Sequence, residues 1–245
     1  IFSTLRKALN EAVYDNLLVK NPCLGAKRPL EEKYHADVYD EEQVKILLQG
    51  LKGTALETEV MLALFLGLRR GEVLGLRFGD CDFKSNQIRI CQQVTTIKSD
   101  YGNGSTYGIK KLKTKSSNRT VTAPGFIMKS IRTRQTQVSS QKSIQAQAYE
   151  DNDLVSCNAN GTPRSPQALY RQYKRLISRL GLPDSRFHDL RHTYASLLLE
   201  NDTELKIISE TLGHSTISTT ANIYVDILSK RDKPAQIMQE KFGGI

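Results

Sequence analysis

The stretch LETEVMLALFLGLRRGEVLGLR, residues 56–77, determines the core of the predicted fold. Its first half is apolar on nearly every side, which is typical of a helix that is buried all round. Gly67 ends this apolar run, and Arg69 and Arg70 follow beside Glu72. One interpretation is a helix C-terminus closed by basic side chains. However, an unpaired guanidinium next to buried positions is unfavourable, so we expect Glu72 or a bound phosphate to satisfy Arg69.

Other helices surround this core in the prediction. Ser165 is placed as an N-cap, with Pro166 at the first helical position and Gly181 beyond the last turn. Asp40 and Gln43 can form a capping box before a second amphipathic stretch. Helical spacing also covers residues 188–200 and 202–213, and the polar run 133–147 is compatible with a helix.

Residues 86–123 follow a different pattern. NQIRICQQVTTI (86–97) alternates apolar and polar residues, which is the period of a half-buried strand, and SDYGNGSTYG (99–108) supplies turn residues. We expect one small antiparallel sheet with one or more hairpins here. The predicted fold class is therefore mainly α with a small antiparallel β-sheet, an α+β fold.

The 245 residues allow one large domain or two small ones. Residues 20–40 contain turn formers without an apolar period, which indicates a linker, and we divide the chain into 1–35 and 36–245. The N-terminal stretch predicts an amphipathic helix and not a signal peptide, because acidic groups interrupt it. No apolar run is long enough to span a bilayer. A chain that begins inside a helix without an initiator Met suggests a fragment.

The net charge of +9 favours a polyanionic partner such as nucleic acid. The alternative is a soluble basic protein without such a partner. The four cysteines are far apart and form no C-x-x-C pair. This spacing disfavours structural zinc and a disulfide framework, and it fits buried thiols in a reducing cytosol.

KKLKTKSSNR (110–119) concentrates positive charge on the predicted hairpin, at Lys110, Lys111, Lys113, Lys115 and Arg119. Most such runs are solvated faces. The more specific interpretation is a hairpin tip inserted at a DNA groove.

HDLRHTYASLLLE (188–200) places His188, Arg191 and His192 at the start of a helix. His188 and His192 have the i, i+4 spacing of metal ligands, but the cation of Arg191 on the same turn would repel a metal. A phosphate fits better, because His188 and Arg191 share one face and a helix N-terminus favours anions.

LGHSTISTTANIYVD (212–226) contains His214 just past a predicted helix end and Tyr224 ten residues later. Either residue alone can be an ordinary core side chain.

The motifs GLRRGE, KTKSSNR, HDLRH and LGH with a tyrosine ten residues later occur in a specific order. Together they resemble the catalytic domain of tyrosine recombinases, the phage-integrase family, over about residues 38–226. The likeness is greatest to integrases of conjugative transposons and temperate phages of Gram-positive bacteria. It implies that residues 1–35 are the end of a core-binding domain plus a linker, and that residues 36–245 are the catalytic domain with a C-terminal tail helix.

The resemblance also implies roles for individual residues. The catalytic set would be Arg69, Lys113, His188, Arg191, His214 and Tyr224, with Lys115 as a competitor for the lysine. Glu72 matches an acidic position that orients the site. Lys110, Lys111, Lys115 and Arg119 would bind DNA.

The implied reaction is transesterification at a DNA phosphodiester, with Tyr224 as the nucleophile and a 3′-phosphotyrosyl intermediate. His188 would accept the phenol proton, and Lys113 would protonate the leaving 5′-oxygen. Arg69 and Arg191 would each hold non-bridging oxygens, and His214 would donate a further hydrogen bond. Such chemistry needs no metal and no nucleotide cofactor.

The implied partners are double-stranded attachment sites, three further copies of the chain in a tetramer joined through residues 225–245, and excisionase or DNA-bending proteins. Alternatively, the tail packs on its own domain through Ile237 and Met238. The implied location is the bacterial cytoplasm, at the nucleoid and without membrane contact. The competing functions are a type IB topoisomerase, a non-catalytic DNA-binding regulator, and a metallohydrolase built on His188 and His192.

Overall fold

The computed structural model describes residues 1–26, 37–98, 105–112, 117–214, 216 and 221. The chain divides into two compact units, Ile1–His35 and Ala36–Ile245. In the first unit, helix α1 (Phe2–Tyr14) precedes a short 3-10 turn, η1 (Pro22–Leu24). The Asn21 side chain joins them by donating to the Arg6 carbonyl (3.0 Å) and to Asn10 Oδ1 (2.6 Å). What residues 1–35 are in functional terms stays a prediction.

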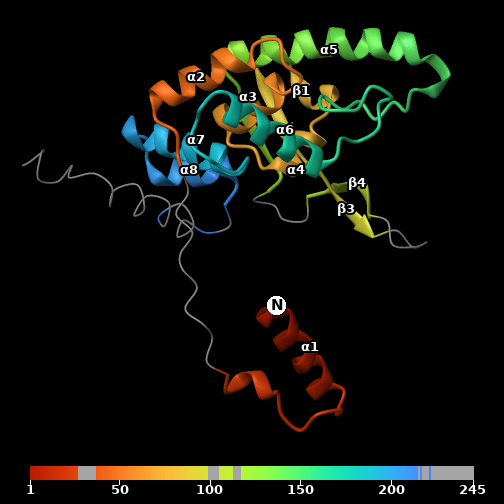
Figure 1. Ribbon diagram of the computed structural model, residues 1–245, viewed down its shortest axis with the longest axis vertical. Coiled ribbons are helices and arrows are strands. Elements are labelled where there is room, and N and C mark those ends of the chain that lie inside the picture. Colours follow the sequence, from red (N-terminus) through yellow and green to blue (C-terminus); the bar gives the residue numbers. More distant parts are fainter. Residues whose placement is uncertain (27–36, 99–104, 113–116, 215, 217–220, 222–245) are drawn as a thin grey trace, which may run out of the picture. The chain divides into compact units, whose positions relative to one another are not determined.

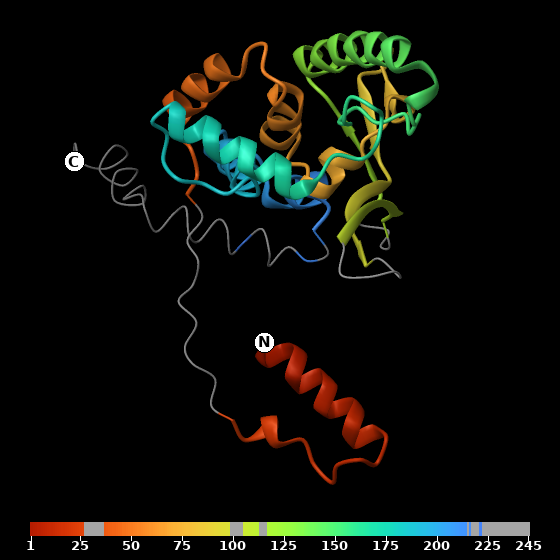
Figure 2. The same ribbon diagram turned by 45° about the vertical axis from the view of Figure 1, so that its right-hand side comes forward.

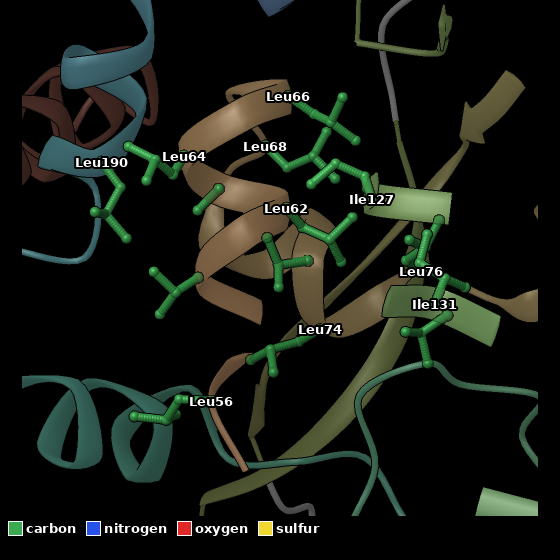
Figure 3. Close-up of a cluster of buried hydrophobic side chains, with 14 of the residues drawn as sticks. Leu56, Leu62, Leu64, Leu66, Leu68, Leu74, Leu76, Ile127, Ile131 and Leu190 are labelled. Atoms are coloured by element: carbon green, nitrogen blue, oxygen red, sulfur yellow. The ribbon is translucent and has the colours of Figure 1, made fainter. Parts of the chain in front are cut away.

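The second unit is built around helix α3 (Glu57–Leu66), as its apolar sequence predicts (Figure 1). Leu62 and Leu64 of α3 are fully buried. Helix α7 (Asp189–Glu200) contributes Leu190 on one side of this core, and helix α5 (Gly125–Gln145) contributes Ile127 and Ile131 on the other (Figure 3). Gly67 ends α3 in the left-handed conformation, with φ of +61°.

Two predicted helix starts are confirmed by their caps. At the start of α2 (Glu41–Leu51), Gln43 N donates to Asp40 Oδ1 at 2.8 Å and Asp40 N donates to Gln43 Oε1 at 3.2 Å. At the start of α6 (Pro166–Arg179), Ser165 Oγ accepts from Ala168 N at 3.2 Å. The remaining helices of this unit include α4 (Arg70–Gly75), α8 (Leu205–Leu212) and the short turns η2 (Phe78–Asp80) and η3 (Ala146–Ala148).

The start predicted for the helix at 202–213, at Asp202, is wrong. Asp202 adopts a φ of +55°, outside the helical region, and α8 begins at Leu205 with Glu204 in the cap position. Its end at Gly213, with φ of +66°, is confirmed.

The strands form two antiparallel sheets where one was predicted. Strands β1 (Cys81–Asp82), β2 (Gln87–Ile90) and β5 (Arg119–Thr122) make the first sheet in the order β1-β2-β5. Strands β3 (Gln92–Lys98) and β4 (Ser105–Lys111) make a separate hairpin. Figure 2 shows this hairpin apart from the sheet below α5.

Helix α4 gives the reason for the separation. A Cβ added at Gly75 would lie 2.7 Å from Gln93 Cα, and one at Gly71 would lie 2.9 Å from the Val94 carbonyl. The two glycines therefore let β3 lie directly on the α4 backbone, which turns it away from β2. None of the helices in the described part of the chain is long and apolar enough to cross a membrane.

Candidate active site

Arg69 lies at the cap position of α4 and is paired with Glu72, one of the two partners expected from the sequence. Arg69 N donates to Glu72 Oε2 at 3.0 Å, and Arg69 Nη1 donates to Glu72 Oε1 at 2.8 Å. The Glu72 side chain is only 1% exposed, whereas that of Arg69 is 34% exposed. Glu72 thus anchors the backbone and side chain of Arg69, while the outer side of the guanidinium faces solvent.

Arg191 is held by backbone carbonyls. It lies in α7, is 2% exposed, and donates from Nη1 to the Gly67 carbonyl at 2.6 Å and from Nη2 to the Leu212 carbonyl at 2.7 Å. Burial, as the main cause, and repulsion from Arg69, as the next, lower its pKa to about 9. The guanidinium is therefore still charged at pH 7.

Arg119 is placed differently from the prediction that grouped it with the exposed lysines. Its side chain turns inward from β5 and is 8% exposed. Nη1 and Nη2 donate to the two carboxylate oxygens of Glu72 at 3.2 and 3.0 Å, and Nε donates to the Thr211 carbonyl at 2.7 Å. The buried Glu72 carboxylate attracts it, because an unpaired buried charge would be strongly destabilising.

The C-terminal end of α8 brings the three arginines together. The carbonyls of Thr211, Leu212 and Gly213 accept from Arg119, Arg191 and Arg69 respectively, the last at 3.1 Å. These carbonyls lie at the negative end of the helix dipole, which favours cations. One helix end therefore gathers guanidinium groups from three separate parts of the chain.

The three arginines differ in how many N–H groups they donate to the rest of the protein. A guanidinium has five N–H donors. Within the described residues, Arg69 and Arg191 each give two of these to the protein, whereas Arg119 gives four. Arg69, whose side chain is 34% exposed, can therefore donate to a bound anion. Arg191 also keeps three N–H groups but is 2% exposed, and Arg119 is largely occupied.

Two histidines adjoin the arginines. His214 directly follows the carbonyls at the end of α8 and is half-buried. Its pKa is lowered to about 4, mainly by burial and then by the charges of Arg191 and Arg69. The ring is therefore neutral at pH 7. His188 lies at the cap position of α7, with its ring centroid 5.1 Å from that of His192 in an edge-on arrangement.

The pKa of His188 is lowered as well, mainly by desolvation and then by His192 and Arg191. Because His188 remains exposed to solvent, water screens part of this effect. The direction favours a neutral imidazole that can accept a proton. In the described residues, no three His, Cys, Asp or Glu side chains gather as they would around a metal ion.

A cleft of about 470 Å³ opens beside Arg69 and His188. Its walls include Arg70 and Arg186, two cations that the sequence did not single out as site residues, together with Gln93, Thr95 and Tyr170. The close spacing of Gly71 and Gly75 is the sequence feature that could have predicted the approach of β3 to this cleft. The accepting carbonyls at 211–213 have no signature in the sequence.

Of the other predicted site residues, the structure describes two. Lys110 and Lys111 lie exposed on β4. Lys113, Lys115 and Tyr224 lie outside the described residues, as do residues 225–245 with Ile237 and Met238.

Comparison with known sequences identifies related proteins. The model of the phage integrase family matches residues 37–231. The tyrosine recombinase XerC-like protein of Caldanaerobacter subterraneus subsp. tengcongensis is 35% identical over 240 residues, covering 93% of this chain and 61% of that protein. The ICEBs1 integrase of Bacillus subtilis is 26% identical over 235 residues, covering 95% and 62%. The chain thus spans about three fifths of the length of these relatives.

Solved structures share the fold. A Tn1549 transposon integrase in complex with transposon right end DNA has a TM-score of 0.74 at 20% identity, covering 99% of this chain and 78% of that one. A lambda integrase dimer bound to a COC′ core site has a TM-score of 0.59 at 17% identity, covering 91% and 70%. The predicted α+β fold, that of a tyrosine recombinase catalytic domain, is confirmed.

Proposed function

This chain belongs to the phage integrase family, and on that premise we propose that it cleaves and rejoins double-stranded DNA as a tyrosine site-specific recombinase. The observation that carries the proposal is the pairing of Arg69 and Arg191. They lie far apart in the sequence, bond to neighbouring carbonyls of one helix end, and each give only two of five N–H groups to the described residues. Two guanidinium groups suit the charge that develops on a phosphodiester in its transition state.

In the proposed reaction, the Tyr224 hydroxyl attacks the phosphorus and passes its proton to neutral His188. The bond between phosphorus and the 5′-oxygen breaks, and Lys113 protonates the leaving oxygen, with Lys115 as the alternative donor. A 3′-phosphotyrosyl link and a free 5′-hydroxyl result. Arg69 and Arg191 hold the non-bridging oxygens, His214 donates a hydrogen bond to one of them, and Glu72 orients Arg69.

Exposed Lys110 and Lys111 would contact the DNA backbone on one side of the site, with Lys115 in the same basic stretch. The cleft lined by Arg70 and Arg186 offers further positive charge beside Arg69. Arg119 would not contact DNA, because four of its N–H groups donate to protein atoms.

The proposed biological role is integration and excision of a mobile element. Among the related proteins, one is named as the ICEBs1 integrase and another is a transposon integrase in complex with a circular intermediate DNA. On the same grounds we propose a tetramer on paired attachment sites, linked by residues 225–245 and assisted by excisionase or DNA-bending proteins. A place at the bacterial nucleoid is part of this proposal.

The test captures the covalent intermediate. The 245-residue chain is incubated with a pool of nicked duplexes whose core is randomised, so that a short cleaved strand diffuses away and cannot be rejoined. We expect an adduct that survives denaturing electrophoresis for the wild type and for Tyr14→Phe, a control at a tyrosine that is 83% exposed. Tyr224→Phe should give none.

An adduct that persists in Tyr224→Phe, or no adduct from any duplex in the pool, would contradict the proposal. The recovered duplexes then supply a defined substrate. With paired copies of that substrate, strand exchange supports a recombinase, whereas relaxation of supercoils without exchange would indicate a topoisomerase instead.

A further inference from the structure

Arg119 connects three parts of the candidate active site. It lies at the start of β5, directly after the basic stretch that ends β4. Its guanidinium bonds to Glu72 in α4 and, through Nε, to the Thr211 carbonyl at the end of α8. Nη1 also donates to the Ser117 carbonyl at 3.2 Å, within its own strand connection. The side chain therefore links Ser117 and β5 to the elements that carry Arg69 and His214.

The Glu72 carboxylate is shared by two arginines. Oε1 accepts from Arg69 Nη1 and Arg119 Nη1, and Oε2 accepts from Arg69 N and Arg119 Nη2. Paired N–H groups of Arg119 fix both oxygens, and so fix the plane of the carboxylate. Because the same two oxygens orient Arg69, the direction of the Arg69 guanidinium depends on Arg119.

The second connection acts on His214. Arg119 holds the Thr211 carbonyl, and His214 follows three residues later at the end of the same helix. Loss of Arg119 would release this helix end from β5 while leaving Arg191 on Leu212 and Arg69 on Gly213.

We propose that Arg119 is a positioning residue for phosphodiester cleavage, which acts by fixing Glu72 and the end of α8 and not by contacting DNA. This inference rests on the proposed function. It also differs from the expectation that Arg119 binds DNA directly, and the two make opposite predictions for binding and for cleavage.

The test uses Arg119→Gln, Arg119→Lys and the control Lys110→Gln in the 245-residue chain. Binding to a duplex of unrelated sequence is measured from low to moderate salt. A residue that contacts a phosphate contributes about 0.9 to the slope of log affinity against log salt. We expect Lys110→Gln to reduce the slope by about this amount and both Arg119 variants to leave it unchanged, provided that each melts cooperatively.

Cleavage is measured in a single turnover at saturating concentrations of the duplex recovered by covalent capture. A misplacement of about 1 Å in a catalytic group can reduce the rate about 100-fold. We expect a loss of that order for Arg119→Gln and a smaller loss for Arg119→Lys, since lysine keeps the charge but cannot bond to both oxygens. The control for the saturated rate is Lys45→Gln, at an exposed lysine paired with Glu42 on α2, and it should cleave at the wild-type rate.

The pH profile separates positioning from a general loss of stability. The groups facing Glu72 are Arg69 at the α4 cap, Arg119 of β5 and Arg191 of α7. Burial by itself would raise the pKa of Glu72, and Arg119 is the first of the groups that keep it low. The acidic limb of cleavage should therefore move to higher pH in Arg119→Gln and less so in Arg119→Lys.

A reduced salt slope with a normal saturated rate for Arg119→Gln would overturn the inference and make Arg119 a phosphate contact. Normal slopes, rates and pH profiles would overturn it also. If Arg119→Gln fails to melt cooperatively, the saturated rate and the pH profile of Arg119→Lys decide, because lysine keeps the charge that sets the salt slope. A wild-type chain without cleavage would contradict the proposed function, and the salt slopes would still test whether Arg119 contacts DNA.

Discussion

Arg191 and Arg69 bond to adjacent carbonyls at the end of α8. Arg191 Nη2 lies 2.7 Å from the Leu212 carbonyl, and Arg69 Nη2 lies 3.1 Å from the Gly213 carbonyl. Two like charges are held close together, which is unfavourable without a negative partner. The helix dipole and Glu72 supply part of that compensation, and a phosphodiester would supply the rest.

Glu72 should make the stability of the chain depend on pH. Burial opposes its ionisation, but Arg119 and Arg69 hold its pKa below the usual 4.5. Its stabilising contribution is therefore complete above the unfolded pKa and is lost as pH falls through the lower folded value. We expect Glu72→Gln to be less stable than the wild type at pH 7, with a difference that shrinks below about pH 4.5. Urea unfolding across this range measures it, and a difference independent of pH would contradict the assignment.

His214 should resist protonation. Burial and the nearby arginines lower its pKa to about 4. Nitrogen-resolved NMR of the imidazole should therefore show a neutral ring at pH 6, where an ordinary histidine is mostly charged. A titration midpoint near 6.5 would show that the arginines do not surround the ring as described.

Gly75→Ala should destabilise the domain and disturb β3. The added Cβ would lie 2.7 Å from Gln93 Cα, and backbone cannot give way as a flexible side chain can. Such overpacking costs about 1–3 kcal/mol. Denaturant unfolding measures the change against Gly125→Ala, where nothing lies within 4 Å of the new Cβ. Equal stability of the two variants would argue against the close packing of α4 on β3.

The catalytic lysine can be identified by changing the leaving group. Loss of a general acid reduces the rate by about 10²–10⁴-fold. We expect Lys113→Ala to show such a loss on ordinary DNA and to regain activity on DNA with a bridging 5′-sulfur, because a thiolate leaves without a proton. Lys115→Ala serves as the matched control. The reverse pattern would assign the role to Lys115, and absence of rescue in both would exclude the pair.

Much of the helical fold could be predicted because its determinants are local. The apolar composition of residues 56–66 requires burial, and Ser165 with Pro166 defines a helix start independently of the rest of the fold. The division into two sheets could not be predicted from strand alternation. It depends on contact between α4 and β3, which is a tertiary property.

The proximity of four expected site residues followed from motif spacing, but their organisation did not. Motif spacing identified Arg69, His188, Arg191 and His214, which lie close to the end of α8 or to the adjoining cleft. The orientation of Arg119 was missed, because its position in a basic run resembles that of the neighbouring lysines. Its partners are a distant carboxylate and a backbone carbonyl, and a carbonyl is present at every residue.

The most direct measurement of the central claim is peptide mapping of the covalent adduct by mass spectrometry. The account predicts that the nucleotide remains attached to Tyr224 through a 3′-phosphate, and that Arg191→Ala forms far less of this adduct. Attachment to another residue, a 5′-phosphate linkage, or an undiminished adduct in Arg191→Ala would contradict it.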